Sequence, residues 1–277
     1  MSEAGVNAAG PRLFLLDIEG TVAPLSLTSK VLFPYARGHF EEFLRESIAD
    51  FEDFVRRSAA VIERTGFGPA ELGEGALMRD LMLLNIENQN EQDPDAPRTL
   101  PNVPGAVSMS SAKDIPRILN YVYWLMDRDR KSAALKSMQG KIWKKGFESG
   151  ELQGTLFEDV PAAFARWSAG ARVAIYSSGS AEAQQLLFQY SNYGDLTPMV
   201  AGYFDTRRGP KGEPASYAAI AKAMEVEPAE VLFVSDAVRE LDAAREAGCQ
   251  TRLALRPGNP PVADPHKHAS VESFLAL

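Results

Sequence analysis

The sequence is short of cysteine: Cys249 is the single one in 277 residues, which excludes an internal disulfide or a cysteine metal cluster. Long hydrophobic runs are also missing, because no stretch approaches the roughly 18 apolar residues that a membrane-spanning helix needs. The first residues show no basic segment followed by an apolar one, so we expect no secretory signal. The net charge is −8, which excludes an overall attraction to nucleic acid or anionic lipid. We therefore expect a cytoplasmic protein with neither a nucleic-acid nor a membrane partner.

What the sequence does contain is a series of short apolar runs that each end in a polar turn. They occupy residues 12–16, 172–176, 231–234 and 251–255. Runs of this length that end in a turn are typical of buried parallel strands. Segments with a helical pattern accompany them, at residues 158–167, 181–190, 215–224 and 238–247. Strands that alternate with helices predict an α/β fold with a doubly wound parallel sheet.

The alternation of strand-like runs and helical segments stops between residues 21 and 150, where strand-like runs are missing. The apolar spacing there predicts amphipathic helices over residues 32–65 (with a break), 74–88 and 114–139, and a loop over 88–102. We therefore predict an α/β core of residues 1–24 and 151–277, interrupted after its first strand by an all-helical insert of residues 25–150.

Two carboxylates stand directly after the first predicted strand, in the run Asp17-Ile-Glu19-Gly20-Thr21. In an open parallel sheet, ligands bind beyond the carboxyl ends of the strands, and Asp17 closes such a strand. If the turn curls at Gly20, Asp17 and Glu19 reach one small volume. One can then act as nucleophile or metal ligand and the other as proton donor or acceptor. The alternative is an ordinary turn, in which Asp and Gly are common.

Hydroxyl groups and a lysine follow later elements of the core. Ser177 and Ser178 close the second strand and open a helix, where hydroxyls and unpaired N–H groups can cradle a phosphate. The alternative is a helix N-cap by Ser178 or Ser180. Lys211 lies on a loop rich in Gly and Pro before a helix, from which it can neutralise a phosphate as a point charge. Its alternative is a solvated surface lysine.

Asp236 ends the third strand and is followed four residues later by Glu240. Asp236 can supply a second carboxylate to a hard cation, since magnesium accepts one or two carboxylates together with phosphate oxygens and waters. The alternatives are helix capping for Asp236 and a salt bridge for Glu240. A phosphate site needs a cation, anion-binding donors and a nucleophile together. We therefore predict that Asp17, Ser177, Lys211 and Asp236 converge on one cavity.

This set resembles the haloacid dehalogenase superfamily of phosphohydrolases, and more closely its enolase-phosphatase family of methionine salvage. The superfamily pattern has a second Asp where this chain has Glu19, and Glu there is a feature of the enolase-phosphatase family. The helical insert takes the place of the superfamily's cap. Further matching runs are residues 32–35, 129–131, 134–136, 139–140, 143, 175–184, 204–206, 216–217 and 256–259. The pattern departs at Val22 and Ala23, where the family has threonines.

The resemblance implies a magnesium-dependent phosphoric monoester hydrolase, an acireductone synthase. It would enolise 2,3-diketo-5-methylthiopentyl-1-phosphate and then remove the phosphate to give the acireductone. Asp17 would be the nucleophile, forming an aspartyl-phosphate, and also a magnesium ligand. The backbone carbonyl of Glu19 and the carboxylate of Asp236 would complete the protein's share of the shell of one Mg²⁺ per subunit.

The same resemblance assigns the remaining site residues. Ser177 and Ser178 would hold phosphate oxygens, and Lys211 would bridge the phosphoryl group and the nucleophile. Glu19 is our candidate for the base of the enolisation, because its extra methylene extends past the phosphate toward the carbon skeleton. The resemblance also suggests a monomer whose partner is a small phosphorylated diketone.

Several residues and functions stay open. Lys131, Lys136 and Trp143 are candidates for the lining of the cap, and a solvated or packed helix face is the alternative for each. We expect His39, His266 and His268 to be surface residues rather than ligands, and Cys249 to be a small core residue. Two other functions compete: a magnesium-dependent sugar-phosphate phosphatase of the same superfamily, and a non-enzymatic phospho-acceptor module.

Overall fold

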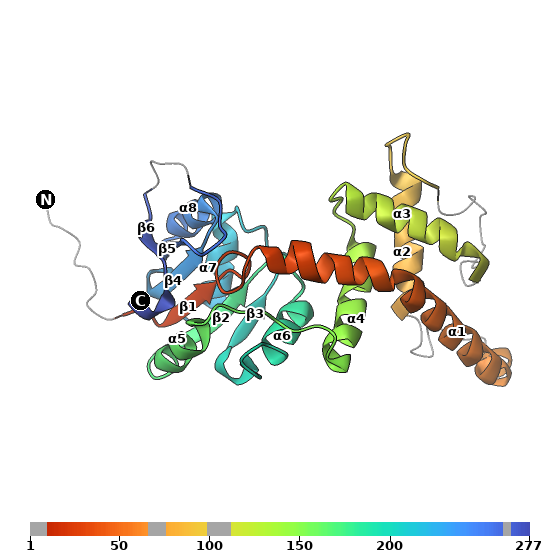
Figure 1. The fold of residues 1–277 in the computed structure, drawn as a ribbon, viewed down its shortest axis with the longest axis horizontal. Coiled ribbons are helices and arrows are strands. Elements are labelled where there is room, and N and C mark those ends of the chain that lie inside the picture. Colours follow the sequence, from red (N-terminus) through yellow and green to blue (C-terminus); the bar gives the residue numbers. More distant parts are fainter. Residues whose placement is uncertain (1–9, 66–75, 99–111, 263–266) are drawn as a thin grey trace, which may run out of the picture. The chain divides into compact units, whose positions relative to one another are not determined.

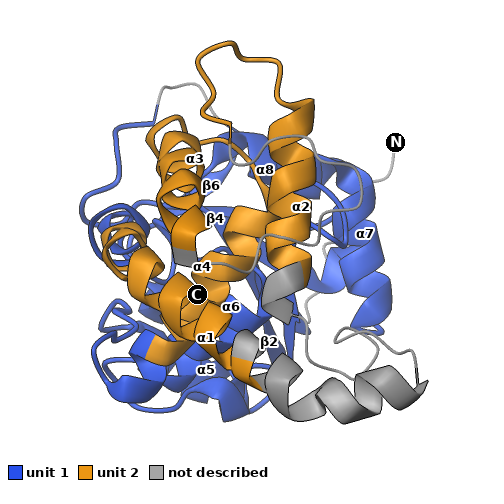
Figure 2. Ribbon diagram, turned by 90° about the vertical axis from the view of Figure 1, so that its right-hand side faces the viewer, with its two compact units in different colours: residues 1–32, 146–277 blue, residues 33–145 orange. Residues whose placement is uncertain are grey.

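The computed structural model divides into two compact units (Figure 2). One comprises residues 1–32 and 146–277, and the other comprises residues 33–145. The structure describes residues 10–65, 76–98, 112–262 and 267–277. None of the helices in these ranges is both long and apolar enough to cross a membrane. The assignment of residues 25–150 to a cap remains a prediction.

The first unit is built on a six-stranded parallel sheet with the order β3-β2-β1-β4-β5-β6 (Figure 1). Its strands are β1 (Leu13–Leu16), β2 (Arg172–Tyr176), β3 (Gly202–Phe204), β4 (Val231–Ser235), β5 (Gln250–Ala254) and β6 (Ala269–Val271). The four predicted strands are present, each with bounds within one residue of the prediction. β3 and β6 were not predicted, because three residues are too few to show a pattern. The doubly wound fold is confirmed.

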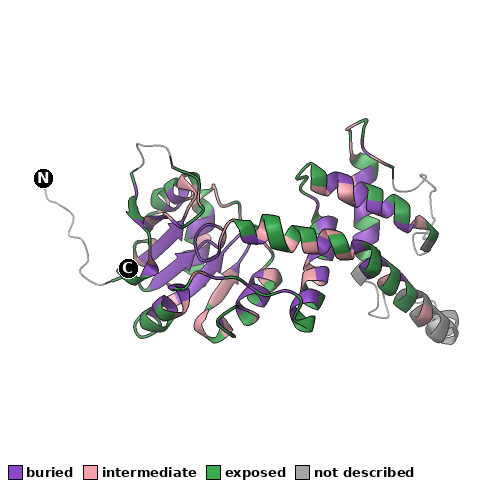
Figure 3. Cartoon of the chain, in the orientation of Figure 1, coloured by how far each residue is buried: buried purple, intermediate pink, exposed green. Residues whose placement is uncertain are grey.

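Helices cover both faces of this sheet because successive strand side chains point to opposite sides. Leu13 and Leu15 pack with residues of α7 (Pro214–Ala223) and α8 (Val238–Glu246). Phe14 points the other way and stacks on Trp167 of α5 (Val160–Trp167), with ring centroids 3.9 Å apart. The helix α6 (Ala181–Gln189) follows β2. The central strands β1, β2 and β4 are buried between these layers (Figure 3).

The strand order places a switch point between β1 and β4. The chain runs outward from β1 through β2 to β3 and then returns to the opposite side of β1 at β4. Leu16 pairs with Ile175 on one side and with Val234 on the other, so these three strands end at the same level. In doubly wound sheets a ligand binds in the crevice beyond the strand ends at this switch point.

The described part of the second unit is helical. It contains α1 (Phe33–Thr65), α2 (Ala76–Asn90) and α3 (Ile115–Asp127), and α4 (Ala133–Ser149) extends past its boundary. Its core includes Phe40, Leu44, Ile118, Val122 and Met138. The break predicted within residues 32–65 is wrong: α1 is continuous and is preceded by a π-helix, η1 (Thr28–Leu32).

The single helix predicted over residues 114–139 is also wrong, because α3 ends at Asp127 and α4 starts at Ala133. Asp129 has a φ of 47°, which interrupts the helix. Glu87 of α2 then accepts the backbone N–H of Ala133 at 3.0 Å, and the Ser132 hydroxyl accepts that of Leu135 at 2.9 Å. These bonds cap a new helix N-terminus, and one of the two partners is remote in sequence.

One histidine differs from the prediction as well. His268 is buried, with Nδ1 2.7 Å from the Thr251 hydroxyl, because it directly precedes the unpredicted strand β6, which pairs with β5. His39 is half-buried, with Nδ1 2.8 Å from the carbonyl of Tyr35. Cys249 is buried as predicted. His266 lies outside the described residues.

Candidate active site

Asp17 lies at the carboxyl end of β1, at the switch point of the sheet. Its backbone N–H continues the pairing with β4 by donating to the carbonyl of Val234 at 3.0 Å. Its side chain is only 9% exposed, and Oδ1 accepts the N–H of Ile18 at 2.8 Å. The carboxylate is therefore held at the edge of the sheet, where its second oxygen faces the neighbouring strand end.

Lys211 reaches this carboxylate from a different loop. Its Nζ lies 2.6 Å from Asp17 Oδ1 and 2.6 Å from Glu240 Oε2, and its side chain is 10% exposed. Burial alone would lower the pKa of Lys211, but the attraction of the two carboxylates outweighs burial and raises that pKa. Lys211 is therefore a permanent positive charge between two carboxylates, not a solvated surface group.

Three buried hydroxyl groups position the loop that carries Lys211. Tyr176 donates to the carbonyl of Gly209 at 2.7 Å, Ser216 to that of Pro210 at 2.8 Å, and Tyr217 to that of Lys211 at 2.7 Å. Gly209 has a φ of 146°, and a β-carbon there would collide with the Ser216 hydroxyl. Hydrogen bonds to three successive carbonyls thus fix the backbone of the loop, and with it the position from which the Lys211 side chain extends.

Asp236 and Glu240 bring two more carboxylates from the end of β4 and from α8. Ser235 Oγ lies 3.2 Å from Asp17 Oδ2 and 3.0 Å from Glu240 Oε2, and donates to one of them at a time. Asp236 does not cap α8; the N–H of Ala237 is instead accepted by Ser235 Oγ at 3.1 Å. The capping alternative for Asp236 is therefore not observed, whereas the salt bridge of Glu240 is present.

Gly20 allows Asp236 to approach the loop after β1. Its φ is 67°, which favours glycine, and a β-carbon at this position would collide with the Asp236 carboxylate. The turn at Gly20 therefore brings the Asp17–Thr21 loop against the end of β4.

Negative charge exceeds positive charge in this cluster. Burial and the neighbouring carboxylates of Asp17 and Glu240 raise the pKa of Asp236 to about 6. Burial and Asp17 also raise the pKa of Glu240, although Lys211 opposes this shift. Three carboxylates around one lysine favour a further cation.

The donor set suits magnesium. Among the described residues, no three His, Cys, Asp or Glu side chains form a metal cage. A cation here would rely on the carboxylates of Asp17 and Asp236, on a backbone carbonyl, and on water or substrate oxygens. Magnesium binds in this way, because it keeps several waters and takes one or two protein carboxylates.

Glu19 is half-buried and has a partner that the sequence did not indicate. The Thr28 hydroxyl, in the first turn of the π-helix η1, donates to Glu19 Oε1. Short π-helical segments are rare and are frequently found at functional sites. One oxygen of the Glu19 carboxylate is thus fixed by Thr28.

Ser177 and Ser178 follow β2, which lies beside β1. Ser177 is buried and its hydroxyl accepts the N–H of Gly179 at 3.3 Å, while Ser178 is exposed. Ser180 caps α6 by accepting the N–H of Ala183 at 3.2 Å. The buried Gln184 donates to the carbonyls of Gly179 and Phe204, both at 2.8 Å, and so fixes this loop. The phosphate role of the two serines remains a prediction.

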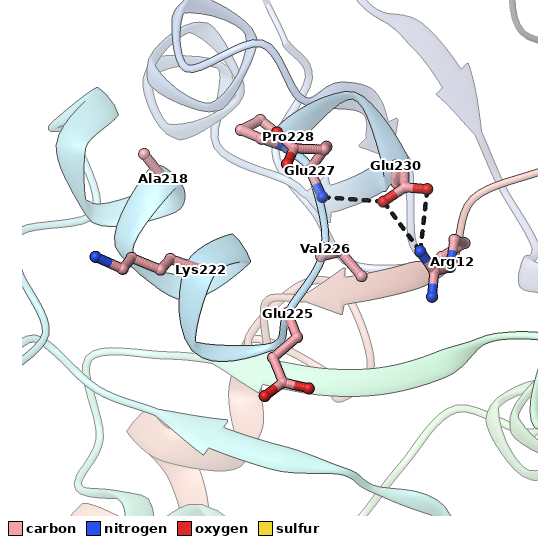
Figure 4. A pocket seen from close by; sticks show the side chains of 8 residues that line it. All are labelled: Arg12, Ala218, Lys222, Glu225, Val226, Glu227, Pro228 and Glu230. Atoms are coloured by element: carbon pink, nitrogen blue, oxygen red, sulfur yellow. Dashed lines mark hydrogen bonds and ion pairs between the residues drawn. The ribbon is translucent and has the colours of Figure 1, made fainter.

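A pocket lies at the opposite end of the sheet (Figure 4). It is lined in part by Arg12, which precedes β1, and by Glu230, which precedes β4, and these two form an ion pair at 3.3 Å. It therefore lies at the amino ends of the strands, whereas the carboxylate cluster lies beyond their carboxyl ends. In the second unit, Lys131 and Lys136 are exposed, and Trp143 stacks on Phe33. Their role as cap lining stays a prediction.

Comparisons with known proteins agree with this arrangement. The family model described as haloacid dehalogenase-like hydrolase matches residues 11–248. Enolase-phosphatase E1 of Synechococcus elongatus is 49% identical over 246 residues, which cover 88% of this chain and 89% of that protein. Enolase-phosphatase E1 of Drosophila persimilis is 38% identical over 269 residues, covering 96% and 94%.

A solved structure supports the same relationship. The UTR4 protein of Saccharomyces cerevisiae has a TM-score of 0.68 and 30% sequence identity, with coverage of 97% of this chain and 100% of that chain. The family match spans the elements that carry Asp17, Lys211 and Asp236. The chain therefore belongs to the haloacid dehalogenase-like hydrolases and, within them, to the enolase-phosphatase E1 family.

Proposed function

We propose that this chain is the bifunctional enolase-phosphatase of methionine salvage. It would convert 2,3-diketo-5-methylthiopentyl-1-phosphate into the acireductone 1,2-dihydroxy-3-keto-5-methylthiopentene. The observation that carries the proposal is the 2.6 Å pair of Asp17 and Lys211 at the switch point, in a chain 49% identical to a protein named enolase-phosphatase E1. The cytoplasmic location and the monomeric state stay predictions.

The phosphatase step uses Asp17 as nucleophile. An oxygen of Asp17 attacks phosphorus, the bond between phosphorus and the substrate oxygen breaks, and the released enolate oxygen takes a proton from water. Water then hydrolyses the aspartyl-phosphate and restores Asp17. Phosphoryl transfer depends mainly on positioning and charge stabilisation, which Lys211 provides beside the nucleophile. Ser177 and Ser178 would hold the phosphate oxygens.

A magnesium ion fits beside the nucleophile. Asp17, the backbone carbonyl of Glu19 and the carboxylate of Asp236 would hold it. When bound, it supplies positive charge that stabilises the phosphoryl group. The raised pKa of Asp236 supports this assignment, because a group whose charged form is disfavoured by burial and like charge gains from a nearby cation.

Enolisation needs a base near the carbon that bears the phosphate. We assign this role to Glu19: its carboxylate takes a proton from C1, and the electrons pass to the carbonyl oxygen at C2. Because Thr28 occupies Oε1, the other oxygen of Glu19 is the one that takes the proton. Positioned acids and bases of this kind accelerate proton transfer by about 10²–10⁴-fold.

The function is tested with the purified protein and the diketone phosphate. We expect the absorbance of the enol to rise first and inorganic phosphate to follow. A panel of hexose phosphates serves as the comparison. Rapid phosphate release from many of them without an enol signal would instead identify the chain as a general sugar-phosphate phosphatase.

Replacing Glu19 with glutamine is expected to slow enol formation by about 10²-fold or more, because the amide cannot accept the proton. The rate of enol appearance is the measurement. Hydrolysis of p-nitrophenyl phosphate, which needs no enolisation, should stay within a few-fold of wild type. Glu246→Gln, on the exposed end of α8, is the matched control. An unchanged enolisation rate in Glu19→Gln would remove Glu19 as the base.

A further inference from the structure

The loop after β5, residues 256–259 (Arg-Pro-Gly-Asn), contacts the catalytic loop after β1 although it carries no acid or nucleophile. The Arg256 side chain is 3% exposed, and its Nε donates to the carbonyl of Thr21 at 2.8 Å. The Asn259 amide Nδ2 donates to the carbonyl of Gly20 at 2.9 Å. Two successive carbonyls of the catalytic loop are therefore held by one neighbouring loop.

Arg256 is itself firmly anchored. It forms an ion pair with the buried Asp159 at 2.7 Å and donates to the carbonyl of Glu272 at 2.9 Å. Its guanidinium lies 4.8 Å from the ring centroid of Phe157 and 4.1 Å from that of Phe274. Burial alone would raise the pKa of Asp159, but hydrogen bonds from Arg256 and the backbone of Phe274 outweigh it and lower that pKa. The anchor therefore keeps its charges and its orientation.

The other end of the Asn259 amide is left for a partner from outside the chain. Its Oδ1 is buried and accepts no hydrogen bond from any of the described residues. Buried polar atoms are nearly always paired, so such an acceptor calls for a partner from outside the protein. Asn259 Oδ1 and Asp236 Oδ2 both lie within 3.0 Å of one point, the place where a β-carbon on Gly20 would be. Asn259 Oδ1 and Asp236 Oδ2 therefore both approach Gly20 on its β-carbon side.

We propose that Asn259 is a positioning residue of the cation site. Through Nδ2 it fixes the carbonyl of Gly20 and so the turn that presents Glu19. Through Oδ1 it accepts a hydrogen bond from a water molecule in the shell of the divalent cation that Asp17 and Asp236 bind. This inference rests on the proposed function, because the divalent cation it requires is the one proposed there.

The chemistry of the side chain explains why an amide suits this position. An amide both donates and accepts, so it can bond a carbonyl with one end and a water with the other. A carboxylate would lose the donor to Gly20 and would add negative charge beside Asp17, Asp236 and Glu240. Partners of metal-bound groups typically change metal affinity by about 10–100-fold when they are removed.

The test measures cation binding directly. Asn259→Leu has nearly the same shape but neither donates nor accepts. We expect its affinity for Mn²⁺, followed by electron paramagnetic resonance without substrate, to fall about 10–100-fold. The increase in melting temperature on addition of Mg²⁺ should shrink in parallel. Asn192→Leu is the matched control, since Asn192 also bonds a loop backbone, at Leu156, but lies outside the carboxylate cluster.

A second substitution distinguishes the role of Oδ1 from the role of Nδ2. It also keeps the proposal testable if Asn259→Leu does not fold. Asn259→Asp keeps an acceptor oxygen and loses the donor to Gly20, so its affinity for Mn²⁺ should fall much less than that of Asn259→Leu. A loss in Asn259→Asp as large as that expected for leucine would overturn the role of Oδ1. A folded Asn259→Leu that binds Mn²⁺ within twofold of wild type would overturn the proposal as a whole.

A third variant distinguishes this inference from the function on which it rests. Asp236→Asn removes a proposed ligand and should abolish detectable Mn²⁺ binding. If it does so while Asn259→Leu binds normally, only the role of Asn259 is wrong. If Asp236→Asn binds Mn²⁺ like the wild type, the cation assignment itself is wrong.

Discussion

Replacing Asp17 with asparagine is expected to reduce phosphate release by about 10⁴-fold or more, as the loss of a covalent nucleophile does in other enzymes. The amide has the same shape but is a poor nucleophile toward phosphorus. The fold should survive, because Lys211 keeps its 2.6 Å pair with Glu240. The measurement is release of inorganic phosphate from the diketone phosphate and from p-nitrophenyl phosphate.

The chain offers a matched control for this substitution. Asp80 is also buried, and it is paired with Lys141 at 2.5 Å in the second unit. Asp80→Asn therefore removes the same charge from the same kind of pair, and phosphate release should stay within a few-fold of wild type. Turnover that survives in Asp17→Asn would show that no covalent bond to Asp17 forms.

Replacing Lys211 with methionine is expected to reduce phosphate release by about 10³-fold and to lower the free energy of unfolding by about 3 kcal/mol. The activity falls because the charge beside the nucleophile is gone. The stability falls because Asp17, Asp236 and Glu240 lose the positive charge of Lys211 beside them. Removing one partner of a buried ion pair leaves the other without compensation.

The stability loss in Lys211→Met should depend on pH in a defined direction. Lys211 lowers the pKa of Asp236 and of Glu240, so its removal raises both further above their unfolded values. When the pKa of a carboxyl is higher in the folded than in the unfolded protein, its contribution to the free energy of unfolding is fully present below the unfolded-state pKa. That contribution is lost as the pH rises through the folded-state pKa. The deficit should therefore be small below about pH 4 and largest above about pH 7.

Urea unfolding of metal-free protein across this range measures the effect. Lys141→Met is the control, because among the described residues Lys141 is paired with one carboxylate, that of Asp80, and its side chain is 33% exposed. We expect a smaller stability loss there and normal phosphate release. A deficit of Lys211→Met that is independent of pH would contradict the electrostatic explanation.

The core of the fold could be predicted because its strands are continuous apolar runs that end in polar turns. β1, β2, β4 and β5 have this form, whereas β3 and β6 are too short to show it. The split between α3 and α4 was not predictable from periodicity. It depends on Glu87, a residue remote in sequence, which caps the new helix.

The charged residues of the candidate site could be predicted from the sequence. The side chains that hold those residues in place could not. Asp17 and Asp236 could be placed because each directly follows a strand. Lys211 alone carried little signal, and only its order among the other groups suggested a function. Its burial depends on the hydroxyls of Tyr176, Ser216 and Tyr217, which bond successive carbonyls. Such side-chain bonds to backbone leave no periodic pattern in a sequence.

Contacts between loops that are distant in the sequence could not be predicted either. Nothing in the sequence distinguishes Thr28 from other threonines, whereas in the structure the π-helix brings its hydroxyl to the Glu19 carboxylate. The run at residues 256–259 was recognised by resemblance, but its bonds to Gly20 and Thr21 depend on the pairing of β4 with β5 and on a buried anchor.

The central position of β1 has a consequence for biosynthesis. Asp17 meets Lys211 across 194 residues and Ser235 across 218. On the ribosome, the first strand emerges with neither neighbour available, and the helical unit that follows it is complete long before β4 appears. Nascent chains of this protein therefore carry their nucleophile early but gain catalytic competence only after β4 has been synthesised and the contacts between these remote segments have closed.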